Sequence, residues 1–396
     1  MSEKYFLPSL GLINALGNDI GEIAPRLFSG ETSGLVLEEN WLPSGLARVG
    51  RARGVLPEVP AAFSAYACRN NGLLLAALAQ IRNEVDRTIH RFGKARVGVV
   101  LGTSTSGIAE GGAAIAWRLA HGTLPPEFRY VQQELGMPAI FLSRFLGITG
   151  PAYSVSTACT SSAKAFVSAR NLLRHKLCDA VLVGGVDSLC KLTINGFAAL
   201  ESIAKDRCNP MSRNRKGINI GEGAALFLMT REESAFELLG VGESSDAYHM
   251  SAPQPDGLGA EAAMCVALAD AGLSAEDVDY LNMHATATPK NDEMESRAIS
   301  RMFPQGVAAS GTKPLTGHAL GAAGATELGL CWLALRDGCL PPHVWDEEAD
   351  PELPSLDLVE PGRKFGRVSG RVCMSNSFAF GGSNASLLIG DKRQAR

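Results

Sequence analysis

The sequence predicts an α/β protein in which mostly buried sheets are layered with helices. Six short apolar runs, each bounded by glycine or polar residues, have the length of buried strands and lie at 97–101, 180–184, 224–229, 278–282, 372–374 and 385–389. Longer alanine-rich segments of helical character alternate with them, at 72–82, 161–175, 259–271 and 324–336. Strands that alternate with helices are typical of layered α/β folds.

The glycines indicate where these strands end. Glycine accounts for 43 of the 396 residues, and it clusters at 102–112, 184–188, 217–225, 317–325 and 380–386, each time beside an apolar run. Such clusters are typical of strand-to-loop junctions, where the backbone turns or approaches another segment closely. The segment 231–242 falls between two sets of strands, and no low-complexity linker separates them. Two similar halves packed as one body fit this pattern, although no strong internal repeat is visible.

Composition excludes several classes of protein. Lys and Arg number 37 against 41 Asp and Glu, a net charge of −4, whereas a protein held to nucleic acid by phosphate contacts should be basic. No run of about 18 apolar residues predicts a membrane span, and the first residues lack the apolar core of a signal peptide. The nine cysteines are scattered and never spaced as Cys-x-x-Cys, which favours reduced thiols in a cytoplasm over disulfides or structural zinc.

Cys159 is a candidate nucleophile. It stands in Ser-Val-Ser-Thr-Ala-Cys-Thr-Ser-Ser-Ala at 154–163, between a short run of small and β-branched residues and an alanine-rich helix. A thiol at this turn lies at the helix N-terminus, where partial positive charge favours the thiolate. A buried structural cysteine is the alternative, and that is the interpretation expected for most of the other cysteines.

Two further segments carry histidine. His284 follows the predicted strand 278–282 and precedes two threonines, although a satisfied core histidine has the same pattern. A glycine-rich helix start carries Lys313, His318 and Glu327, but it lacks the Gly-Lys-Ser/Thr ending of a phosphate-binding loop, so nucleotide binding is not expected. The two histidines are too far apart in sequence to be the helical pair of a zinc site.

A fourth segment, Asn-Ser-Phe-Ala-Phe-Gly-Gly-Ser-Asn at 376–384, predicts by itself a tight turn between strands. Together, the four segments resemble the β-ketoacyl-acyl-carrier-protein synthases of the elongating type. The order of Cys159, His284, the Lys313/His318 segment and Phe-x-Phe-Gly-Gly is similar to that family. The resemblance covers most of the chain and includes Ser-Thr-Ala-Cys-Thr-Ser at 156–161, Gly-His-x-Leu-Gly-Ala-Ala-Gly at 317–324 and the stretch 209–223.

The resemblance implies a thiolase-like fold. Two pseudo-symmetric halves, each with a five-stranded sheet, would form a five-layered α-β-α-β-α body. Residues 1–235 would be the half that carries the nucleophilic cysteine, and residues 236–396 would be the half that carries both histidines. The protein would associate as a dimer.

The resemblance also implies the chemistry. Cys159 would take an acyl group from an acyl carrier protein, malonyl-carrier protein would lose carbon dioxide, and the carbanion would attack the acyl-enzyme to give a 3-ketoacyl thioester. His284 and His318 would donate hydrogen bonds to the malonyl thioester carbonyl, and the backbone N–H groups of Cys159 and Phe380 would form the oxyanion hole. No metal and no cofactor is implied.

Other residues match supporting positions of that family. Lys313 and Glu327 resemble a supporting pair near the second histidine, in which Lys313 orients the site or tunes its charge. Thr286 and Thr288 match the hydroxyls that contact pantetheine in that family. Phe380 matches the mobile gate beside the cysteine, and Phe378 its packing neighbour. Gly107-Ile108 resembles the residues that line the acyl pocket.

The chain also departs from the family pattern. The family's His-Gly-Thr is His284-Ala285-Thr286 here, and its Gly-Asp is Asn291-Asp292. Its Pro-Phe is Pro210-Met211, and its acidic residue before Gly217 is Lys216. None of these changes removes a catalytic group. They favour a specialised relative, such as one that builds polyketide or aryl polyene chains, over the housekeeping fatty-acid enzyme.

The implied partner is an acyl carrier protein, loaded with an acyl or a malonyl group. Such a protein is acidic and would dock on a local basic patch. The candidate residues are Arg69, Lys205, Arg207, Arg213, Arg215 and Lys216, although an ordinary solvated loop can carry the same charges. The second subunit of the dimer would be either an identical chain or a homologous chain-length subunit.

Four alternatives share parts of this pattern. A non-catalytic chain-length subunit of a heterodimeric ketosynthase would lack the nucleophilic cysteine. A thiolase would need a second cysteine in a Cys-x-Gly setting, whereas Cys373 stands in Val-Cys-Met. A starter-type condensing enzyme would carry asparagine at the position of His318, and a Cys/His hydrolase would not need the second histidine. The elongating synthase fits best, with the chain-length subunit as the alternative.

Overall fold

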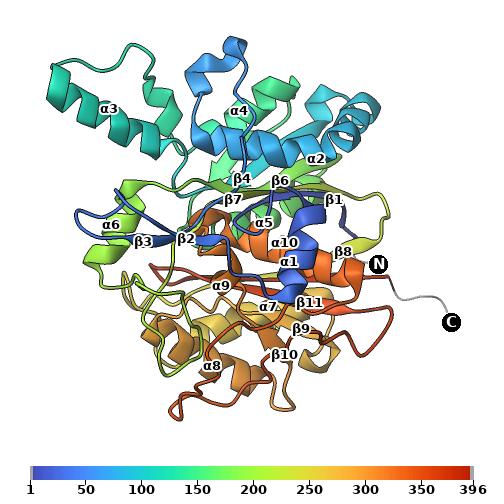
Figure 1. The fold of residues 1–396 in the computed structure, drawn as a ribbon. Coiled ribbons are helices and arrows are strands. Elements are labelled where there is room, and N and C mark those ends of the chain that lie inside the picture. Colours follow the sequence, from blue (N-terminus) through green and yellow to red (C-terminus); the bar gives the residue numbers. More distant parts are fainter. Residues whose placement is uncertain (1–2, 393–396) are drawn as a thin grey trace.

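The computed structural model describes residues 3–392 and places ten strands in the hydrogen-bonded order β10-β9-β11-β12-β8-β1-β7-β6-β4-β5 (Figure 1). Five strands come from the first part of the chain: β1 (Phe6–Ile13), β4 (Val97–Gly102), β5 (Ala152–Val155), β6 (Ala180–Asp187) and β7 (Gly223–Thr230). Five come from the second part: β8 (Phe236–Ser245), β9 (Tyr280–Asn282), β10 (Ala308–Ser310), β11 (Val372–Phe378) and β12 (Ser383–Asp391). The two groups are joined through the pair Phe6–Glu237, between β1 and β8.

The two five-stranded sheets have the same topology. When the strands are numbered within each half, both sheets read 3-2-4-5-1. In both, strands 3, 2 and 4 are parallel, and strand 5 is antiparallel to strands 4 and 1. This repeat confirms the predicted pair of pseudo-symmetric halves. The division at residues 235 and 236 stays a proposal, which the change of sheet between β7 and β8 supports, and residues 1–2 and 393–396 of the proposed halves lie outside the described residues.

Helices form the other three layers (Figure 1). Helices α5 (Ser161–Arg174) and α10 (Ala323–Asp337) lie between the two sheets, and α10 is buried at every residue from Ala323 to Leu335. A helix that is mostly apolar on all sides is stable in such a central layer, and the buried Glu327 of α10 has an ion-pair partner in Lys313. Helices α2 (Arg69–Phe92) and α4 (Met137–Leu146) cover the outer face of the first sheet, and α7 (Leu258–Ala271) and α8 (Pro289–Met302) cover the second. The predicted five-layered, thiolase-like body is confirmed.

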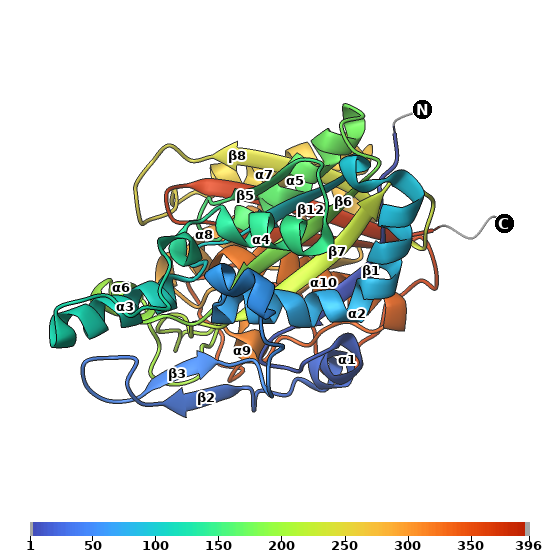
Figure 2. The same cartoon turned by 90° about the horizontal axis from the view of Figure 1, so that it is seen from above.

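The remaining elements lie outside the sheets and helices named above, and two of them, Lys313–Thr316 and Leu320–Ala322, are fully buried. They are helices α1 (Ile20–Ser29), α3 (Ile108–His121), α6 (Lys191–Ala199) and α9 (Lys313–Thr316), strands β2 (Leu35–Glu38) and β3 (Ala47–Gly50), and short 3₁₀ helices at Ala61–Tyr66, Lys94–Arg96, Tyr130–Gln133, Ala275–Asp277 and Leu320–Ala322. Helix α3 stands out from the body in both views (Figures 1 and 2). Three large apolar residues on it are exposed by 45–84%: Ile115, Trp117 and Leu119.

Each of the six predicted strands overlaps an observed strand, and the four predicted helices overlap α2, α5, α7 and α10. The strand predicted at 278–282 is shorter, because β9 begins at Tyr280, and the helix predicted at 72–82 is longer, because α2 runs from Arg69 to Phe92. Six strands are not predicted by the pattern: β1, β2, β3, β5, β8 and β10. Among residues 3–392, no helix is both long and apolar enough to cross a bilayer.

Candidate active site

Cys159 lies on a sharp turn between β5 and the central helix α5. The preceding residue, Ala158, has a φ of 53°, in the left-handed region that residues with a Cβ rarely adopt. The Ala158 carbonyl accepts a hydrogen bond from the backbone N–H of Ser161 at 3.1 Å, which closes the turn. Because α5 begins at Ser161, the partially positive end of the helix lies next to the cysteine.

Burial governs the ionisation of this thiol. Cys159 is 6% exposed. Burial raises the pKa of its thiol to about 11, although the Lys313 ammonium and the backbone N–H of Phe380 both act to lower it. The resting nucleophile is therefore a neutral thiol at pH 7, and its proton must leave during attack.

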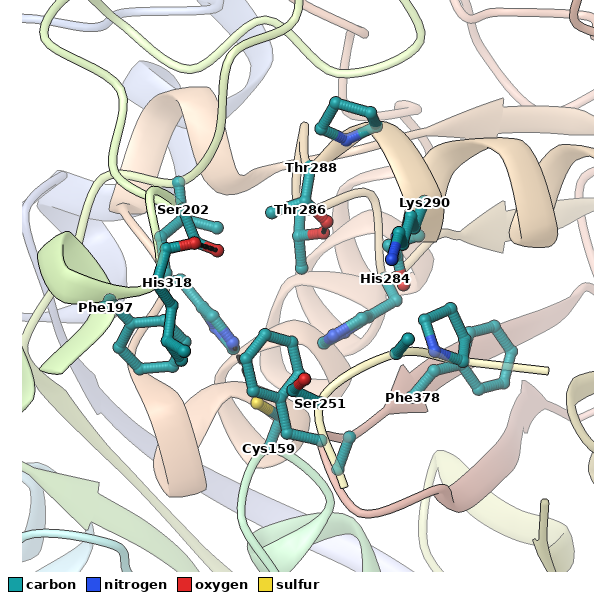
Figure 3. Close-up of a pocket in the computed structure, with 18 of the residues that line it drawn as sticks. Cys159, Phe197, Ser202, Ser251, His284, Thr286, Thr288, Lys290, His318 and Phe378 are labelled. Carbon is teal, nitrogen blue, oxygen red and sulfur yellow. Dashed lines mark hydrogen bonds between the residues drawn. The ribbon is translucent and has the colours of Figure 1, made fainter. Parts of the chain in front are cut away.

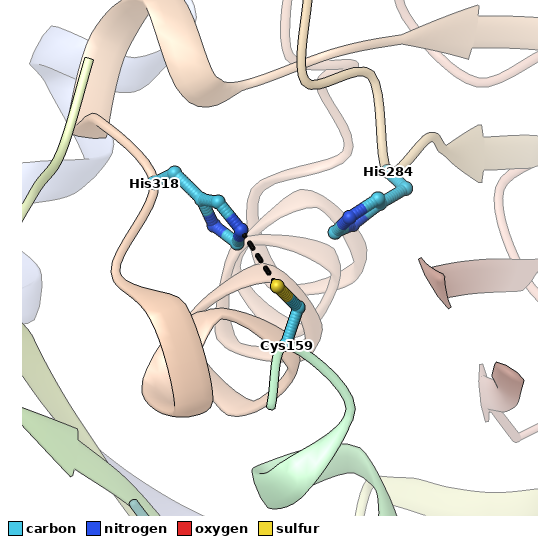
Figure 4. Close-up of side chains that lie close together, drawn as sticks. All are labelled: Cys159, His284 and His318. Carbon is cyan, nitrogen blue, oxygen red and sulfur yellow. Dashed lines mark hydrogen bonds between the residues drawn. The ribbon is translucent and has the colours of Figure 1, made fainter. Parts of the chain in front are cut away.

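His318 is in direct contact with the cysteine, since its Nε2 lies 3.1 Å from Sγ (Figure 4). Its backbone N–H donates to the Asn219 carbonyl at 2.7 Å, and its carbonyl accepts from the Gly221 N–H at 2.9 Å. Within residues 3–392, the buried Nδ1 has no hydrogen-bond partner. The ring is therefore positioned through its backbone. Burial, together with the Lys313 ammonium, holds the pKa of His318 well below 6.5, so the ring is neutral.

His284 approaches the same sulfur from the loop after β9. Its ring centroid lies 5.4 Å from that of His318, with the two rings nearly perpendicular at 83°. Lys313 Nζ lies 3.4 Å from Nδ1 of His284. Because an ammonium only donates, Nδ1 accepts this hydrogen bond and the ring proton is on Nε2. Burial first, then Lys313 and His318, holds the pKa of His284 well below 6.5.

A carboxylate holds the backbone of this histidine loop. Glu295 is fully buried and accepts the N–H groups of His284 and Ala285 at 2.7 Å each. The loop is strained, since Ala285 and Ala287 have φ values of 38° and 62°. Ala285 replaces the glycine expected from the family pattern, and its methyl group fits beside Gly311, where a second Cβ would come within 2.4 Å.

Lys313 and Glu327 form an ion pair behind the histidines. Both side chains are at most 3% exposed, and Lys313 also donates to the His284 carbonyl. Burial raises the pKa of Glu327 against the opposing effect of Lys313. Neither residue lines the pocket described next. Lys313 therefore contacts His284, through its ring and its carbonyl, and its role in orienting the site stays a prediction.

A pocket of about 330 Å³ gives access to the cysteine and both histidines (Figure 3). Thr286 and Thr288 line it, with their hydroxyl oxygens 2.9 Å apart. Its wall also contains residues that no sequence motif indicates, because α6, the loop after β8 and the start of α8 reach the pocket only through tertiary packing: Phe197, Ser202, Ser251 and Lys290.

The Phe-x-Phe-Gly-Gly segment closes one side of this pocket. Phe378 is buried at the end of β11, with its ring centroid 6.1 Å from that of His284. Phe380 is half-buried and lies 5.5 Å from Phe197, ring centroid to ring centroid. Gly381 and Gly382 have φ values of 89° and 78°, so this turn needs glycine.

Ile108 and the basic residues lie elsewhere. Ile108 begins α3 and is not part of the wall of the 330 Å³ pocket. Arg69 pairs with the buried Glu222, and the largely buried Arg215 pairs with Asp350. The structure thus shows buried or largely buried ion pairs for two of the predicted docking residues, and on the surface Arg213 pairs with Glu348 at 2.6 Å. The others are exposed or half-buried on the surface: Lys205, Arg207, Arg213 and Lys216.

The ligand atoms of Cys159, His284 and His318 all lie within 4.8 Å of one another. A thiolate and two imidazoles are suitable zinc ligands, and this spacing allows one ion to contact all three. The absence of a metal in the function of this site therefore stays a prediction.

Comparisons with known proteins agree with this geometry. Residues 71–235 match the family model described as beta-ketoacyl synthase, N-terminal domain, and residues 235–345 match the corresponding C-terminal domain. Nodulation protein E of Rhizobium sp. (strain N33) is 31% identical over 98% of this chain and 99% of its own. The 3-oxoacyl-[acyl-carrier-protein] synthase 2 of Coxiella burnetii is 37% identical over 61% of this chain and 62% of its own.

Among solved structures, a chain of the ketosynthase ApeO in complex with its chain length factor ApeC, from Xenorhabdus doucetiae, is 44% identical. The match covers 98% of both chains with a TM-score of 0.95. Matched by the models of both domains of the family, and by nodulation protein E over nearly its full length, the chain belongs to the beta-ketoacyl synthase family.

Proposed function

We propose that this chain is a β-ketoacyl-acyl-carrier-protein synthase, an acyltransferase that elongates a carrier-bound acyl chain. The observation that carries the proposal is the convergence of one thiol and two neutral imidazoles in a single pocket. Sulfur supplies a nucleophile that is also a good leaving group, and two ring N–H groups supply donors for a developing oxyanion. The family membership supports the same reaction class.

In the first half-reaction, Cys159 Sγ attacks the thioester carbonyl of an acyl-carrier protein. A carbon–sulfur bond forms to Cys159, the bond to pantetheine breaks, and the thiol proton passes to the leaving pantetheine sulfur. His318 Nε2, 3.1 Å from Sγ, is placed to relay that proton. The backbone N–H groups of Cys159 and Phe380, which both act on this sulfur, would form the oxyanion hole.

In the second half-reaction, malonyl-carrier protein loses its carboxylate as carbon dioxide, and the electron pair moves onto the thioester carbonyl. The Nε2–H of His284, fixed by Lys313, and the ring of His318 would donate to that enolate oxygen. The α-carbon then attacks the acyl-enzyme, the Cys159 thiolate leaves, and one proton taken up from solvent restores the thiol. The unpartnered Nδ1 lets His318 use different tautomers in the two half-reactions.

The walls of the pocket fit a carrier-bound substrate. The hydroxyls of Thr286 and Thr288 would hydrogen-bond to the pantetheine arm, and Phe380 would act as the gate, with Phe378 packed against the substrate side. We place the acyl chain toward Ile108. The nine free cysteines support the predicted cytoplasmic location.

Two partners are proposed. An acidic acyl carrier protein would dock near the pocket on Lys205, Arg207, Arg213 and Lys216. A second subunit would cover the exposed apolar residues of α3, because a patch of this kind is costly to leave in water. That subunit is either an identical chain or a chain length factor, the partner with which the 44% identical Xenorhabdus ketosynthase was solved.

The alternative function is a partner-dependent or non-catalytic chain-length subunit. Cys159 and both histidines favour the catalytic subunit. A thiolase is disfavoured, because Cys373 is buried inside β11 and is not part of the pocket wall. The pathway would be fatty-acid synthesis or, as the departures from the family pattern favour, a specialised polyketide or aryl polyene pathway.

Intact-protein mass spectrometry tests the proposal. The chain, alone and with a co-expressed chain length factor, is incubated with acyl-carrier proteins of different lengths, and malonyl-carrier protein is added afterwards. We expect an acyl adduct that is absent in Cys159→Ala and that disappears as 3-ketoacyl product forms. An adduct that persists in Cys159→Ala, or no adduct with any donor in either setting, would refute the proposed reaction.

A further inference from the structure

Asp187, the last residue of β6, is a buried carboxylate beside the active site that neither half-reaction uses. Its relative exposure is 0%. Oδ1 accepts four hydrogen bonds, from the hydroxyls of Thr103 and Thr105 at 2.8 Å each and from the N–H groups of Ser104 and Thr105 at 2.8 and 2.7 Å. Oδ2 accepts the N–H of Ala322 at 3.0 Å and shares the Ser104 N–H at 3.1 Å. No ion pair to Asp187 occurs within the part of the chain that the structure describes.

These donors come from two segments that belong to different halves of the molecule. Residues 103–105 follow β4 in the first half, whereas Ala322 lies in the second half, four residues after His318. Neutral donors alone satisfy this carboxylate, so burial raises its pKa while four of the hydrogen bonds oppose that effect. A charge that is costly to bury is thus kept at a junction between the halves.

The junction is packed without space for adjustment. A Cβ on Gly321 would lie 2.7 Å from the N and Oγ of Ser104, and a Cβ on Gly185 would lie 3.0 Å from the Cα of Ala322. Both segments also contain strained residues, since Ser106 and Leu320 have φ values of 45° and 49°. Backbone of this kind persists only where surrounding contacts over-determine it.

The ring of His318 has few contacts that hold it in place. Its Nδ1 has no partner within residues 3–392, so only its backbone and the contact of Nε2 with sulfur orient the ring. At His318 itself, the backbone N–H and carbonyl are held by Asn219 and Gly221. Downstream, the Ala322 N–H bonded to Asp187 is a fixed point on the segment, and Cys159 follows β5, on the same sheet as Asp187.

We propose that Asp187 is a positioning residue that holds His318 against the nucleophile by anchoring the N–H of Ala322 to the first half of the molecule. The proposal rests on the proposed function for its kinetic consequences, but the geometry that it explains is independent of the substrate.

Asp187→Asn is a selective variant, because four of the hydrogen bonds go to Oδ1, whereas the Ala322 N–H bonds only to Oδ2. The amide oxygen can keep the four donors at the Oδ1 position, whereas the amide nitrogen would face the Ala322 N–H, donor against donor. With His318 displaced, kcat for malonyl-carrier decarboxylation should fall on the order of 100-fold. KM should change by less than about two-fold, since the pantetheine-contacting residues are untouched.

Coupling to His318 separates positioning from a general structural role. If Asp187 acts through His318, Asp187→Asn should add less than about two-fold to the loss already caused by His318→Ala. Asp279→Asn is the control: this carboxylate accepts the N–H of Val372 at 2.8 Å and pairs with Arg367, just before the start of β9, and its replacement should leave kcat unchanged. Gly321→Ala, which pushes the same segment away from Ser104 with Asp187 intact, should reproduce the effect and serves if Asp187→Asn does not fold.

The rate of Cys159 alkylation by iodoacetamide against pH gives a readout that needs no substrate. The pH profile of the alkylation rate in Asp187→Asn should be the same as in His318→Ala. The double variant should have the same profile as either single variant. The proposal would be overturned if Asp187→Asn lowered kcat equally in the wild type and in His318→Ala, or if Asp279→Asn lowered kcat as much as Asp187→Asn does. If the wild type neither acylates nor decarboxylates while the alkylation coupling persists, the proposed reaction fails and the positioning role stands.

Discussion

Replacing His343 by asparagine should remove a large part of the acid sensitivity of folding. This histidine is buried, and its Nδ1 accepts the N–H of Gly311 at 2.9 Å while Nε2 lies 3.0 Å from the Pro210 carbonyl. The ring proton is therefore on Nε2, and the ring bridges two loops that border the active site. Burial lowers the pKa of His343 to about 4, against a small opposing effect of the Pro210 carbonyl.

The magnitude follows from proton linkage. Below pH 6.5 the unfolded chain binds a proton at this position, but the folded chain does not bind it until the pH approaches 4. The contribution of the neutral His343 ring to the free energy of unfolding is thus fully present above pH 6.5 and is lost as the pH falls through 4. At ~1.4 kcal/mol per pH unit, this histidine alone accounts for a loss of about 2.5 kcal/mol by pH 4.5 and about 3.4 kcal/mol at lower pH.

Urea unfolding of the wild type and of His343→Asn at pH 7.5, 6.5, 5.5 and 4.5 measures this loss. Asparagine can still accept from Gly311 but does not titrate, so the difference in unfolding free energy between the two proteins should shrink or reverse by about 2.5 kcal/mol between pH 7.5 and 4.5. His121→Asn, at an exposed histidine on α3, is the control for the replacement of a histidine by asparagine. A His343→Asn difference that stays constant across the series would refute the reasoning.

Three other predictions follow from the site. Glu327→Gln leaves the Lys313 ammonium buried without its carboxylate, so urea unfolding should show a loss of about 3–5 kcal/mol, and Lys313→Met combined with Glu327→Gln should regain most of it; equal stability of wild type and Glu327→Gln would contradict this. Gly382→Ala places a Cβ 2.9 Å from the Asp246 Cβ at a φ of 78°. It should lower the free energy of unfolding by about 1–3 kcal/mol and slow acylation of Cys159 in the mass-spectrometric assay. Gly45→Ala, at a position with open space around it, is the control and should leave acylation unchanged. Zinc ions should protect Cys159 from iodoacetamide, reversibly with a chelator and less so in His284→Ala; alkylation that zinc does not slow would show that the three donors do not bind the metal together.

The elements that the sequence predicts are those whose burial is visible in their composition. Strands β4, β6 and β7 are buried at every residue and appear as continuous apolar runs. Strand β5, in contrast, is half-buried throughout, and β10 consists of Ala-Ala-Ser, so neither has an apolar signature. Their place in the sheet is set by pairing with neighbours, which the sequence does not show.

The same distinction applies to the site. Cys159, His284 and His318 are indicated by local motifs, and the fold brings their ligand atoms together. Phe197 and Asp187 act through contacts with segments far away in sequence, so no local pattern identifies them. For the basic residues, the sequence gives the charge but not the partner, and Arg215 pairs with Asp350 across more than a hundred residues.

The order of strands in the first sheet has a consequence for synthesis on the ribosome. Strand β1 is made first, but it pairs with β7, with Ile13 opposite Ala224. The first sheet therefore cannot close until residue 230 has left the exit tunnel, and α5 then still lacks the helix α10 that packs against it. Until α10 has been translated, the nascent chain exposes an apolar face of α5. During this interval, chaperones can bind that face, and the chain is most prone to aggregate.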